Sequence, residues 1–318
     1  MQNKKLKIIF QMDDFNKINP ANDSTLLLAN AAQKLGHQIF FATAEDLFAE
    51  NAQILIKNAE LKLNLEQEKF YSLGVETINK ISDFDFFFIR QDPPVDLDYL
   101  TNSYLLEQAA SQTKIINEPI SIIKFPEKIN PLNYQEYAPQ TIIAADAEIF
   151  REFLAKQKIA ILKPLYACGG AGVKLLQSPQ DQENLIETIH EQQSKFGKYL
   201  IMQEYLPEIK KGDLRILIGV GEILGSFLRV PAEGKVAANL HAGGSAVPAQ
   251  LSALQKDIAA KVGADLLQNK IYLAGLDFIG DKLTEINITS PMGFAEINKL
   301  YQTNSAEKFW DLLLKESL

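Results

Sequence analysis

The sequence predicts an α/β protein of more than one packed unit. Its 318 residues exceed the roughly 100–200 residues of a typical single domain, so two or three units are expected. The apolar run Leu6–Met12 is followed by a helical pattern that Ser24 and Thr25 can cap and that Gly36 ends, and Gln38–Ala42 is a second apolar run. Strand, helix and strand at this spacing form a βαβ unit, which predicts a mainly parallel sheet.

The same reading extends over the first ~120 residues, a length typical of one α/β domain. The expected elements are a buried strand at Phe84–Ile89, a helix over Tyr99–Ala110 and a short strand at Ile115–Ile116. We therefore assign residues 1–122 to an N-terminal, Rossmann-like α/β domain.

The chain after Pro119 has a different pattern, in which strands pair with their neighbours through short loops. We expect a hairpin of Leu214–Val220 with Ile223–Arg229 around Gly221-Glu222. Pro231–Pro248 has few apolar residues and is expected to be a lid or a disordered segment. The other expected strands are Ile159–Pro164, Val173–Leu175, Tyr199–Glu204, Ile271–Phe278 and Lys282–Ile288, and the helices are Asp181–Gln193 and Ala253–Leu267.

Composition limits the function. Hydrophobic residues make up 47% and charged residues 23% of the chain, as in ordinary globular proteins. The net charge of −8 argues against a protein that binds a nucleic-acid backbone. The single cysteine, Cys168, cannot form an internal disulfide, and the apolar run Ile8–Phe10 is too short for a signal peptide or a membrane span. We expect a cytosolic protein that interacts with neither nucleic acid nor membrane.

Three oxygen-bearing side chains near the C-terminus indicate a metal site. Glu285 and Asn287 lie on one face of a strand because residues i and i+2 point the same way, and a hairpin through Gly280-Asp281 brings Asp277 near them. Two carboxylates and an amide oxygen suit Mg²⁺, which keeps waters and takes phosphate oxygens as its other ligands. Ordinary exposed acids beside a turn explain the spacing equally well.

Two further features are typical of phosphate binding. Lys163 interrupts an apolar strand, so its ammonium group points into a cleft or out to water. The glycine loop, residues 167–172, lets backbone N–H groups approach phosphates, although it matches neither a Walker motif nor a dinucleotide fingerprint. A solvated lysine and a plain hairpin loop are the alternatives.

A polar loop after a strand is the last candidate. Gln203–Pro207 and then Gly212–Arg215 can offer backbone groups to an adenine edge and an acid to a ribose, or form an ordinary inter-strand loop. The order of these features along the chain is more informative than any one of them.

In that order the chain resembles the ATP-grasp fold, and over nearly its whole length it resembles bacterial glutathione synthetases. The resemblance is carried by Met12-Asp13, Asp23-Ser24, Arg90–Pro94, Ile161–Pro164, Gly169-Gly170, Tyr205–Lys210, Gly212-Asp213, Arg215, Arg229, Asn239-Leu240, Ala242–Gly244 and Gly275–Pro291.

The resemblance implies a pre-ATP-grasp domain at 1–122 and an ATP-grasp domain at 123–318. The latter divides into a lid subdomain of about 123–202 and a catalytic subdomain of about 203–318. ATP lies between two sheets with two Mg²⁺ ions, for which Mn²⁺ is an alternative. The implied cofactor-binding residues are Lys128, Lys163, Gly169, Gly170, Glu204, Tyr205, Leu206, Asp213 and Asn287, and the metal ligands are Asp277, Glu285 and Asn287.

The implied reaction is phosphorylation of the cysteinyl carboxylate of γ-glutamylcysteine, followed by attack of glycine on the acylphosphate. Arg215, which stabilises an oxyanion, Lys163 and Asn239 are the implied catalytic residues, and Pro231–Pro248 is the implied lid over the intermediate. The resemblance also implies a homotetramer. The implied substrate-binding residues are Asp13, Ser24, Arg90, Arg229, Asn239 and Ser290.

The chain departs from the family pattern at several cationic positions. Ala237, Ser245 and Ala295 stand where the family usually has arginines, and His241 replaces an alanine. Loss of bidentate carboxylate recognition favours, as an alternative, a paralogous ligase with another carboxylate and amine. A catalytically weak ATP-binding protein is a third hypothesis. Cys168 is either a reactive thiol or a small neutral residue, and His241 either orients substrate or is solvated.

Overall fold

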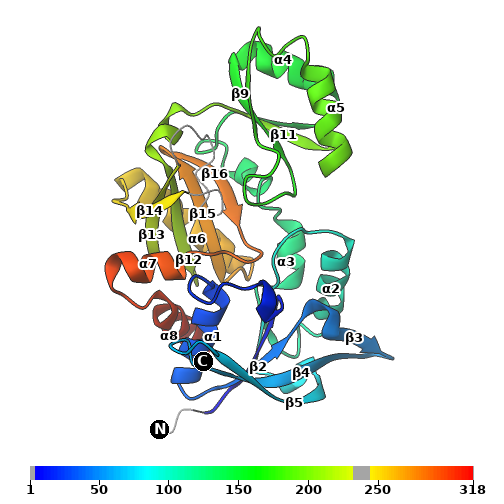
Figure 1. The fold of residues 1–318 in the computed structure, drawn as a ribbon, viewed down its shortest axis with the longest axis vertical. Coiled ribbons are helices and arrows are strands. Elements are labelled where there is room, and N and C mark those ends of the chain that lie inside the picture. The colour runs from blue at the N-terminus through cyan, green and yellow to red at the C-terminus, as the bar shows by residue number, and fades with distance from the viewer. Residues whose placement is uncertain (1–3, 232–243, 318) are drawn as a thin grey trace.

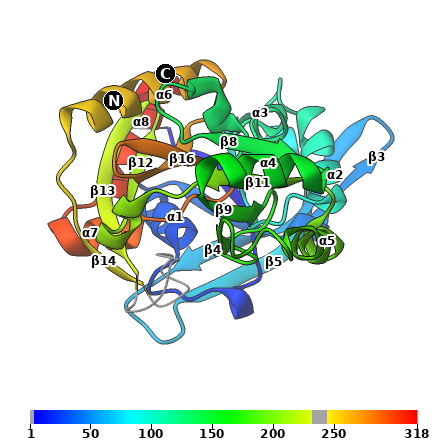
Figure 2. The same cartoon turned by 90° about the horizontal axis from the view of Figure 1, so that it is seen from above.

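The computed structural model describes residues 4–231 and 244–317. In this part of the chain the strands form three sheets, which follow one another along the long axis of the molecule (Figure 1). The N-terminal sheet lies at one end, a five-stranded sheet lies in the middle, and a four-stranded sheet with α4 and α5 lies at the other end. Figure 2 looks down on the end that carries α4 and α5. No helix among the described residues is long and apolar enough to cross a membrane.

The N-terminal sheet is mixed, which corrects the expectation of a mainly parallel one. Its order is β3-β4-β2-β1-β6-β7, and β5 also pairs with β4. The pairs β1/β2, β1/β6 and β6/β7 are parallel, whereas β2/β4, β3/β4 and β4/β5 are antiparallel. β5, one strand of the antiparallel part, was missed because it is mostly exposed and so lacks an apolar pattern. The bounds are β1 Lys7–Met12, β2 Gln38–Ala42, β3 Leu47–Glu50, β4 Gln53–Leu63, β5 Tyr71–Lys80, β6 Phe86–Arg90 and β7 Lys114–Ile116.

Helices cover both faces of this sheet. α1 (Ser24–Lys34) packs on the core that also holds α8 (Ser305–Ser317), while α2 (Leu97–Glu107) and α3 (Pro119–Lys124) lie on the other core. The cap of α1 is Asp23, whose Oδ1 accepts a hydrogen bond from Leu26 N at 2.7 Å, and not the expected Ser24 or Thr25. A carboxylate is the stronger acceptor at a helix N-terminus, and both hydroxyl residues are buried instead.

The four-stranded sheet is antiparallel, in the order β10-β9-β11-β8. Its strands are β8 Thr141–Ala144, β9 Ile159–Pro164, β10 Lys174–Gln177 and β11 Leu200–Glu204. The helices α4 (Ala147–Gln157) and α5 (Leu185–Phe196) bury apolar side chains such as Phe150 and Ile189 against one face. The helix that was expected to begin at Asp181 is α5, which begins four residues later, at Leu185.

The five-stranded sheet is also antiparallel, in the order β14-β13-β12-β15-β16. Its strands are β12 Asp213–Gly219, β13 Glu222–Val230, β14 Ser245–Pro248, β15 Leu273–Ile279 and β16 Lys282–Asn287. The β12–β13 hairpin is confirmed. β14 corrects the expected long loop at its C-terminal end, where short side chains hid the strand. The helices are α6 Ala253–Gln268, α7 Phe294–Tyr301 and α8.

Asn117 joins the N-terminal sheet to the five-stranded sheet. It directly follows β7 and is 3% exposed. Its Nδ2 donates to Leu273 O at 2.8 Å and Ile288 O at 2.7 Å, and its Oδ1 accepts from Tyr272 N and Leu273 N at 2.8 and 2.9 Å. One amide thus satisfies four backbone groups at the ends of β15 and β16, which fixes both strands relative to the N-terminal domain. The division expected at residue 122 stays a prediction.

Candidate active site

A cleft of about 620 Å³ lies between the four-stranded and the five-stranded sheets. One wall comes from β9, β11 and the glycine loop, and the other from β12, β13, β15 and β16. Most of the residues singled out from the sequence line it: Lys128, Lys163, Gly169, Gly170, Glu204, Tyr205, Leu206, Asp213, Arg215, Arg229, Asp277, Glu285, Asn287 and Ser290.

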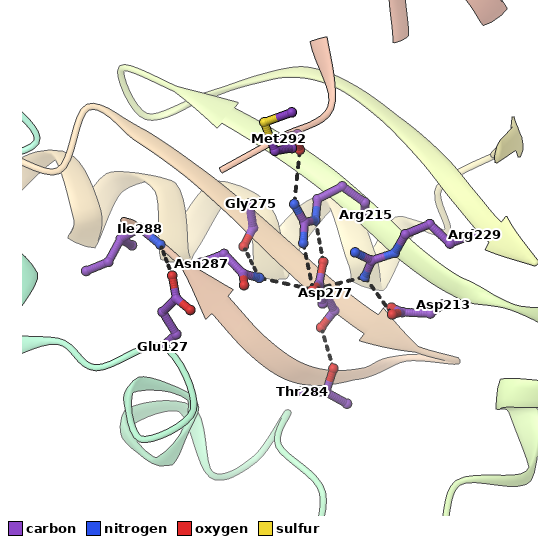
Figure 3. A network of polar contacts seen from close by, with 10 residues as sticks. All are labelled: Glu127, Asp213, Arg215, Arg229, Gly275, Asp277, Thr284, Asn287, Ile288 and Met292. Atoms are coloured by element: carbon purple, nitrogen blue, oxygen red, sulfur yellow. Dashed lines mark hydrogen bonds and ion pairs between the residues drawn. The ribbon is translucent and has the colours of Figure 1, made fainter. Parts of the chain in front are cut away.

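Asp277 is the centre of a buried charge network (Figure 3). Its carboxylate accepts from Arg215 Nε at 2.5 Å and Nη2 at 2.9 Å, and Arg229 Nη2 lies 2.9 Å from Oδ2. Arg229 also pairs with Asp213 at 2.5 Å. The strand register explains the cluster, because Arg215 faces Asp277 across β12/β15 and Asp213 faces Arg229 across β12/β13. Two guanidinium groups therefore converge on carboxylates at the cleft floor.

Burial and charge set the protonation of these acids. Burial raises the pKa of Asp277, but the charges of Arg215 and Arg229 outweigh it and hold that pKa at about 2. Burial, reinforced by the charge of Asp277 and opposed by Arg229, raises the pKa of Asp213 to about 7. Burial lowers the pKa of Arg229, but the charges of Asp213 and Asp277 outweigh burial, so the pKa of Arg229 lies above its ordinary value. Asp277 is thus an anion at neutral pH, held between two cations.

The three expected metal ligands come together across the β15–β16 hairpin. Asp277 faces Glu285, and Gly275 faces Asn287. A β-bulge makes this pairing, since the pairs next to the turn, Ile279 with Lys282 and Phe278 with Leu283, would continue to Thr284 opposite Asp277. The extra residue moves Glu285 onto the Asp277 face.

The donor set fits Mg²⁺. The Asn287 amide nitrogen donates to Gly275 O at 3.2 Å and Asp277 Oδ2 at 3.0 Å, which leaves its oxygen for a cation. Within residues 4–231 and 244–317, no group of three or more His, Cys, Asp and Glu side chains can hold a metal by itself. Two carboxylates and one amide oxygen would therefore need phosphate oxygens and water, as Mg²⁺ sites commonly do.

Two lysines lie close to this set, Lys163 on the opposite wall and Lys128 in the connection after α3. Lys163 Nζ on β9 lies 3.5 Å from Glu285 Oε1, so the ion pair spans the cleft between the sheets. Lys128 Nζ donates to Ala167 O in the glycine loop at 2.6 Å. Gly169 and Gly170 both have positive φ, 65° and 82°, which glycine adopts without strain. The glycine loop joins the antiparallel strands β9 and β10, so it is also the hairpin loop of the alternative interpretation.

Glu204, Tyr205 and Leu206 line the cleft where β11 ends. Glu204 Oε1 accepts from Gln140 N at 2.8 Å, and Tyr205 N donates to Ile159 O at 3.2 Å. These bonds fix the backbone of the segment that the family resemblance implies for adenine binding.

Four of the expected substrate residues fall into two groups. Arg229 and Ser290 line the cleft, whereas Ser24 and Arg90 are buried behind its wall. Arg90 Nη2 donates to Pro291 O at 3.2 Å, and Ser24 Oγ accepts from Gly293 N at 3.2 Å. Asp13 Oδ2 accepts from the N–H of Asp92, a cleft residue, at 2.9 Å.

The remaining positions of interest are divided between described and undescribed parts of the chain. Asn239, Ala237 and His241 lie outside the described residues. Ser245 is exposed at the start of β14, and Ala295 is half-buried on α7. Cys168 is exposed and lines the cleft.

Sequence reasoning missed Glu127, which also lines the cleft. Its Oε1 accepts from Thr289 Oγ1 at 2.8 Å and from the N–H groups of Ile288 and Thr289. Its position directly before Lys128 was the signal that could have identified it.

Models of two domains match the chain. Residues 6–122 match the prokaryotic glutathione synthetase N-terminal domain, and residues 127–302 match the prokaryotic glutathione synthetase ATP-grasp domain. The chain is 35% identical to a glutathione synthetase of Mesorhizobium japonicum over 308 residues, covering 96% of this chain and 97% of that protein. It is 36% identical to one of Agrobacterium fabrum over 309 residues, covering 97% and 96%.

Solved structures show the same fold at low sequence identity. D-cycloserine synthetase DcsG has a TM-score of 0.69 at 14% identity and covers 98% of this chain and 100% of its own. The ATP-grasp ligase PsnB, complexed with a precursor variant, Mg and ADP, has a TM-score of 0.61 at 15% identity and covers 99% of both. The chain belongs to the prokaryotic glutathione synthetase family and is an ATP-dependent carbon–nitrogen ligase with the ATP-grasp fold.

Proposed function

We propose that the protein makes glutathione from ATP, γ-glutamylcysteine and glycine. The γ-phosphoryl group of ATP passes to the cysteinyl carboxylate, giving ADP and an acylphosphate. The glycine amine then attacks the acyl carbon, loses a proton and releases phosphate as the amide forms. The observation that carries the proposal is the cleft of this family member, where Lys128, Lys163 and Arg215 face the oxygens of Asp277, Glu285 and Asn287.

The nucleotide would lie along the cleft, with its adenine against Glu204–Leu206 and its ribose near Asp213. Lys128, Lys163 and the N–H groups of Gly169 and Gly170 would hold the phosphates. Asp277, Glu285 and Asn287 would hold Mg²⁺, as two ions, with Mn²⁺ as an alternative. The cation supplies charge neutralisation during phosphoryl transfer. The 3.5 Å pair of Lys163 with Glu285 supports this placement, because it already joins the two walls between which phosphates would fit.

Arg215 would stabilise the oxyanion of the tetrahedral intermediate. Its Nη1 donates to Met292 O at 3.0 Å, so the guanidinium extends from Asp277 to the wall segment after β16. Gly275 makes room for it, since a Cβ there would lie 2.9 Å from Arg215 Nη1. A planar, permanently charged donor held in place by Asp277 costs little reorganisation during the reaction. Lys163 would assist the same step as a phosphate ligand.

The substrates would be held by Arg229 and Ser290 directly, and by Asn239. Arg90, Ser24 and Asp13 support the site through Pro291, Gly293 and Asp92, whose backbone groups they bind. Curated relatives named glutathione synthetase, at about 35% identity over nearly the whole chain, favour this substrate pair over another carboxylate and amine, despite Ser245 and Ala295.

We further infer a homotetramer in the cytosol, with a lid subdomain at about 123–202 and a catalytic subdomain at about 203–318. Light scattering tests the assembly, which is expected at four times the chain mass of 35.6 kDa. A mass equal to that of one chain contradicts it.

ADP release in a coupled assay tests the reaction. Release that requires both γ-glutamylcysteine and glycine, and that Glu285→Ala abolishes, is expected. No stimulation by either substrate rejects the proposed reaction, and a screen of other amino acids and dipeptides then tests the paralogous ligase. Absence of ADP release with every substrate pair would leave only the third hypothesis, a catalytically weak ATP-binding protein.

A further inference from the structure

We infer that Glu127 is a positioning residue that sets Asn287 and Lys128 for metal-bound nucleotide. The inference rests on the ATP and Mg²⁺ site proposed above. Glu127 lies in the connection that follows α3 and leads to the four-stranded sheet, and it is neither a metal ligand nor a phosphate ligand in that proposal.

Glu127 holds the outer edge of β16. β16 is the last strand of its sheet, so the N–H groups on its outer side need partners other than a neighbouring strand. Glu127 O accepts from Ile286 N at 3.1 Å. Its carboxylate accepts from Ile288 N at 3.2 Å, Thr289 N at 3.3 Å and Thr289 Oγ1 at 2.8 Å. One residue therefore fixes the backbone on both sides of Asn287.

The side chain of Asn287 depends on this backbone. Its amide nitrogen reaches Asp277 at 3.0 Å and Gly275 O at 3.2 Å only while the strand end keeps its place. Figure 3 shows Glu127 reaching from the connection to Ile288, with Asn287 between Glu127 and Asp277. Hydrogen bonds that N–H and O–H groups donate to a carboxylate are stronger than those to a neutral acceptor. The Glu127 carboxylate is therefore suited to hold the edge of a strand.

The next residue reaches the opposite wall. Lys128 Nζ donates to Ala167 O of the glycine loop at 2.6 Å. Because Glu127 is bound to β16, the pair Glu127-Lys128 sets the separation between Asn287 and the phosphate-binding side. Removing the Glu127 carboxylate should therefore weaken the binding of nucleotide with metal more than the binding of nucleotide alone.

The test measures the factor by which Mg²⁺ tightens ADP binding, by calorimetry with ADP in the presence of Mg²⁺ and of EDTA. Glu127→Ala is expected to lower this factor about tenfold or more, since partners that orient metal ligands change metal affinity by about 10–100-fold. Glu127→Gln keeps an acceptor and should lose only about threefold. Glu136→Gln removes a charge from an exposed pair with Lys261, 2.9 Å long, and serves as the matched control with an unchanged factor.

A double variant separates positioning from general damage. If Glu127 acts through Asn287, Glu127→Ala combined with Asn287→Ala should lower the factor no further than Asn287→Ala alone. Additive losses, or an unchanged factor with only a lower melting temperature in Glu127→Ala, overturn the inference. Should that variant fail to fold, Thr289→Val removes one donor and should shift the factor in the same direction. ADP binding that Mg²⁺ does not tighten in the unaltered protein rejects the proposed site itself.

Discussion

Replacing Asp277 by asparagine isolates the energy of the buried network. The change keeps the shape and one acceptor oxygen but removes the charge that pairs with Arg215 and Arg229. The side chains of all three are at most 9% exposed, so water cannot replace the lost anion. Removing one partner of a buried ion pair costs about 3–5 kcal/mol. The pKa of Asp277, about 2 against an ordinary 3.8, corresponds to roughly 2 kcal/mol at about 1.36 kcal/mol per unit.

The free energy by which the Asp277 carboxylate stabilises the fold depends on pH. Because the folded-state pKa is lowered, the stabilisation is present above the unfolded pKa near 4 and is lost as pH falls toward 2. Urea unfolding without metal should therefore show Asp277→Asn less stable by about 2–5 kcal/mol at pH 7, with this difference falling to roughly half by pH 3. In the variant, Asp213 still pairs with Arg229 and compensates in part for the lost charge. We therefore expect a loss of stability near the lower end of this range.

The matched control is Asp281→Asn in the turn of the same hairpin. Among the described residues, the exposed carboxylate of Asp281 accepts a side-chain hydrogen bond only from Ser252 Oγ, at 3.1 Å. Its cost should stay below about 1 kcal/mol. A cost for Asp277→Asn below about 1 kcal/mol at pH 7, or one that does not shrink between pH 4 and pH 3, refutes the reasoning.

Three further predictions concern the cleft and the domain joint. Glu285→Gln should change the free energy of unfolding by less than about 1 kcal/mol, because the pair of Glu285 with Lys163 is partly solvated. The same variant should lower the rate of ADP release by at least about 100-fold. A loss of activity that is explained by unfolding of the variant contradicts this prediction. Lys163→Met should raise the KM for ATP about tenfold or more, since it removes a phosphate ligand; steady-state kinetics with an unchanged KM and kcat reject that role. Asn117→Leu removes the side-chain partner of four buried backbone groups. It should destabilise the protein by about 3 kcal/mol or more in urea unfolding. A loss below about 1 kcal/mol shows that other groups form hydrogen bonds with these backbone groups.

The fold was predictable where local pattern and burial agree. β1, α1, β2, β6 and β12 through β13 have apolar runs or helical spacing that tertiary packing reinforces. β5 and β14 were missed because they lie at sheet edges, where one or both faces meet solvent and the apolar alternation disappears. Local patterning carries little information about such strands, which are placed mainly by backbone pairing with one neighbouring strand.

Residue patterns predicted a type of site but left alternatives: alternation puts Glu285 and Asn287 on one face, and a lysine inside a strand points to a cleft or to water. The folded structure was needed to show that Asp277 faces Glu285, because a two-residue turn alone would pair it with Thr284, and the bulge changes the register. It also decided that Arg215 and Arg229, distant in sequence, meet on Asp277, and that Glu127 holds the strand beside Asn287. These contacts join strands and connections whose pairing depends on long-range packing, which residue spacing does not encode.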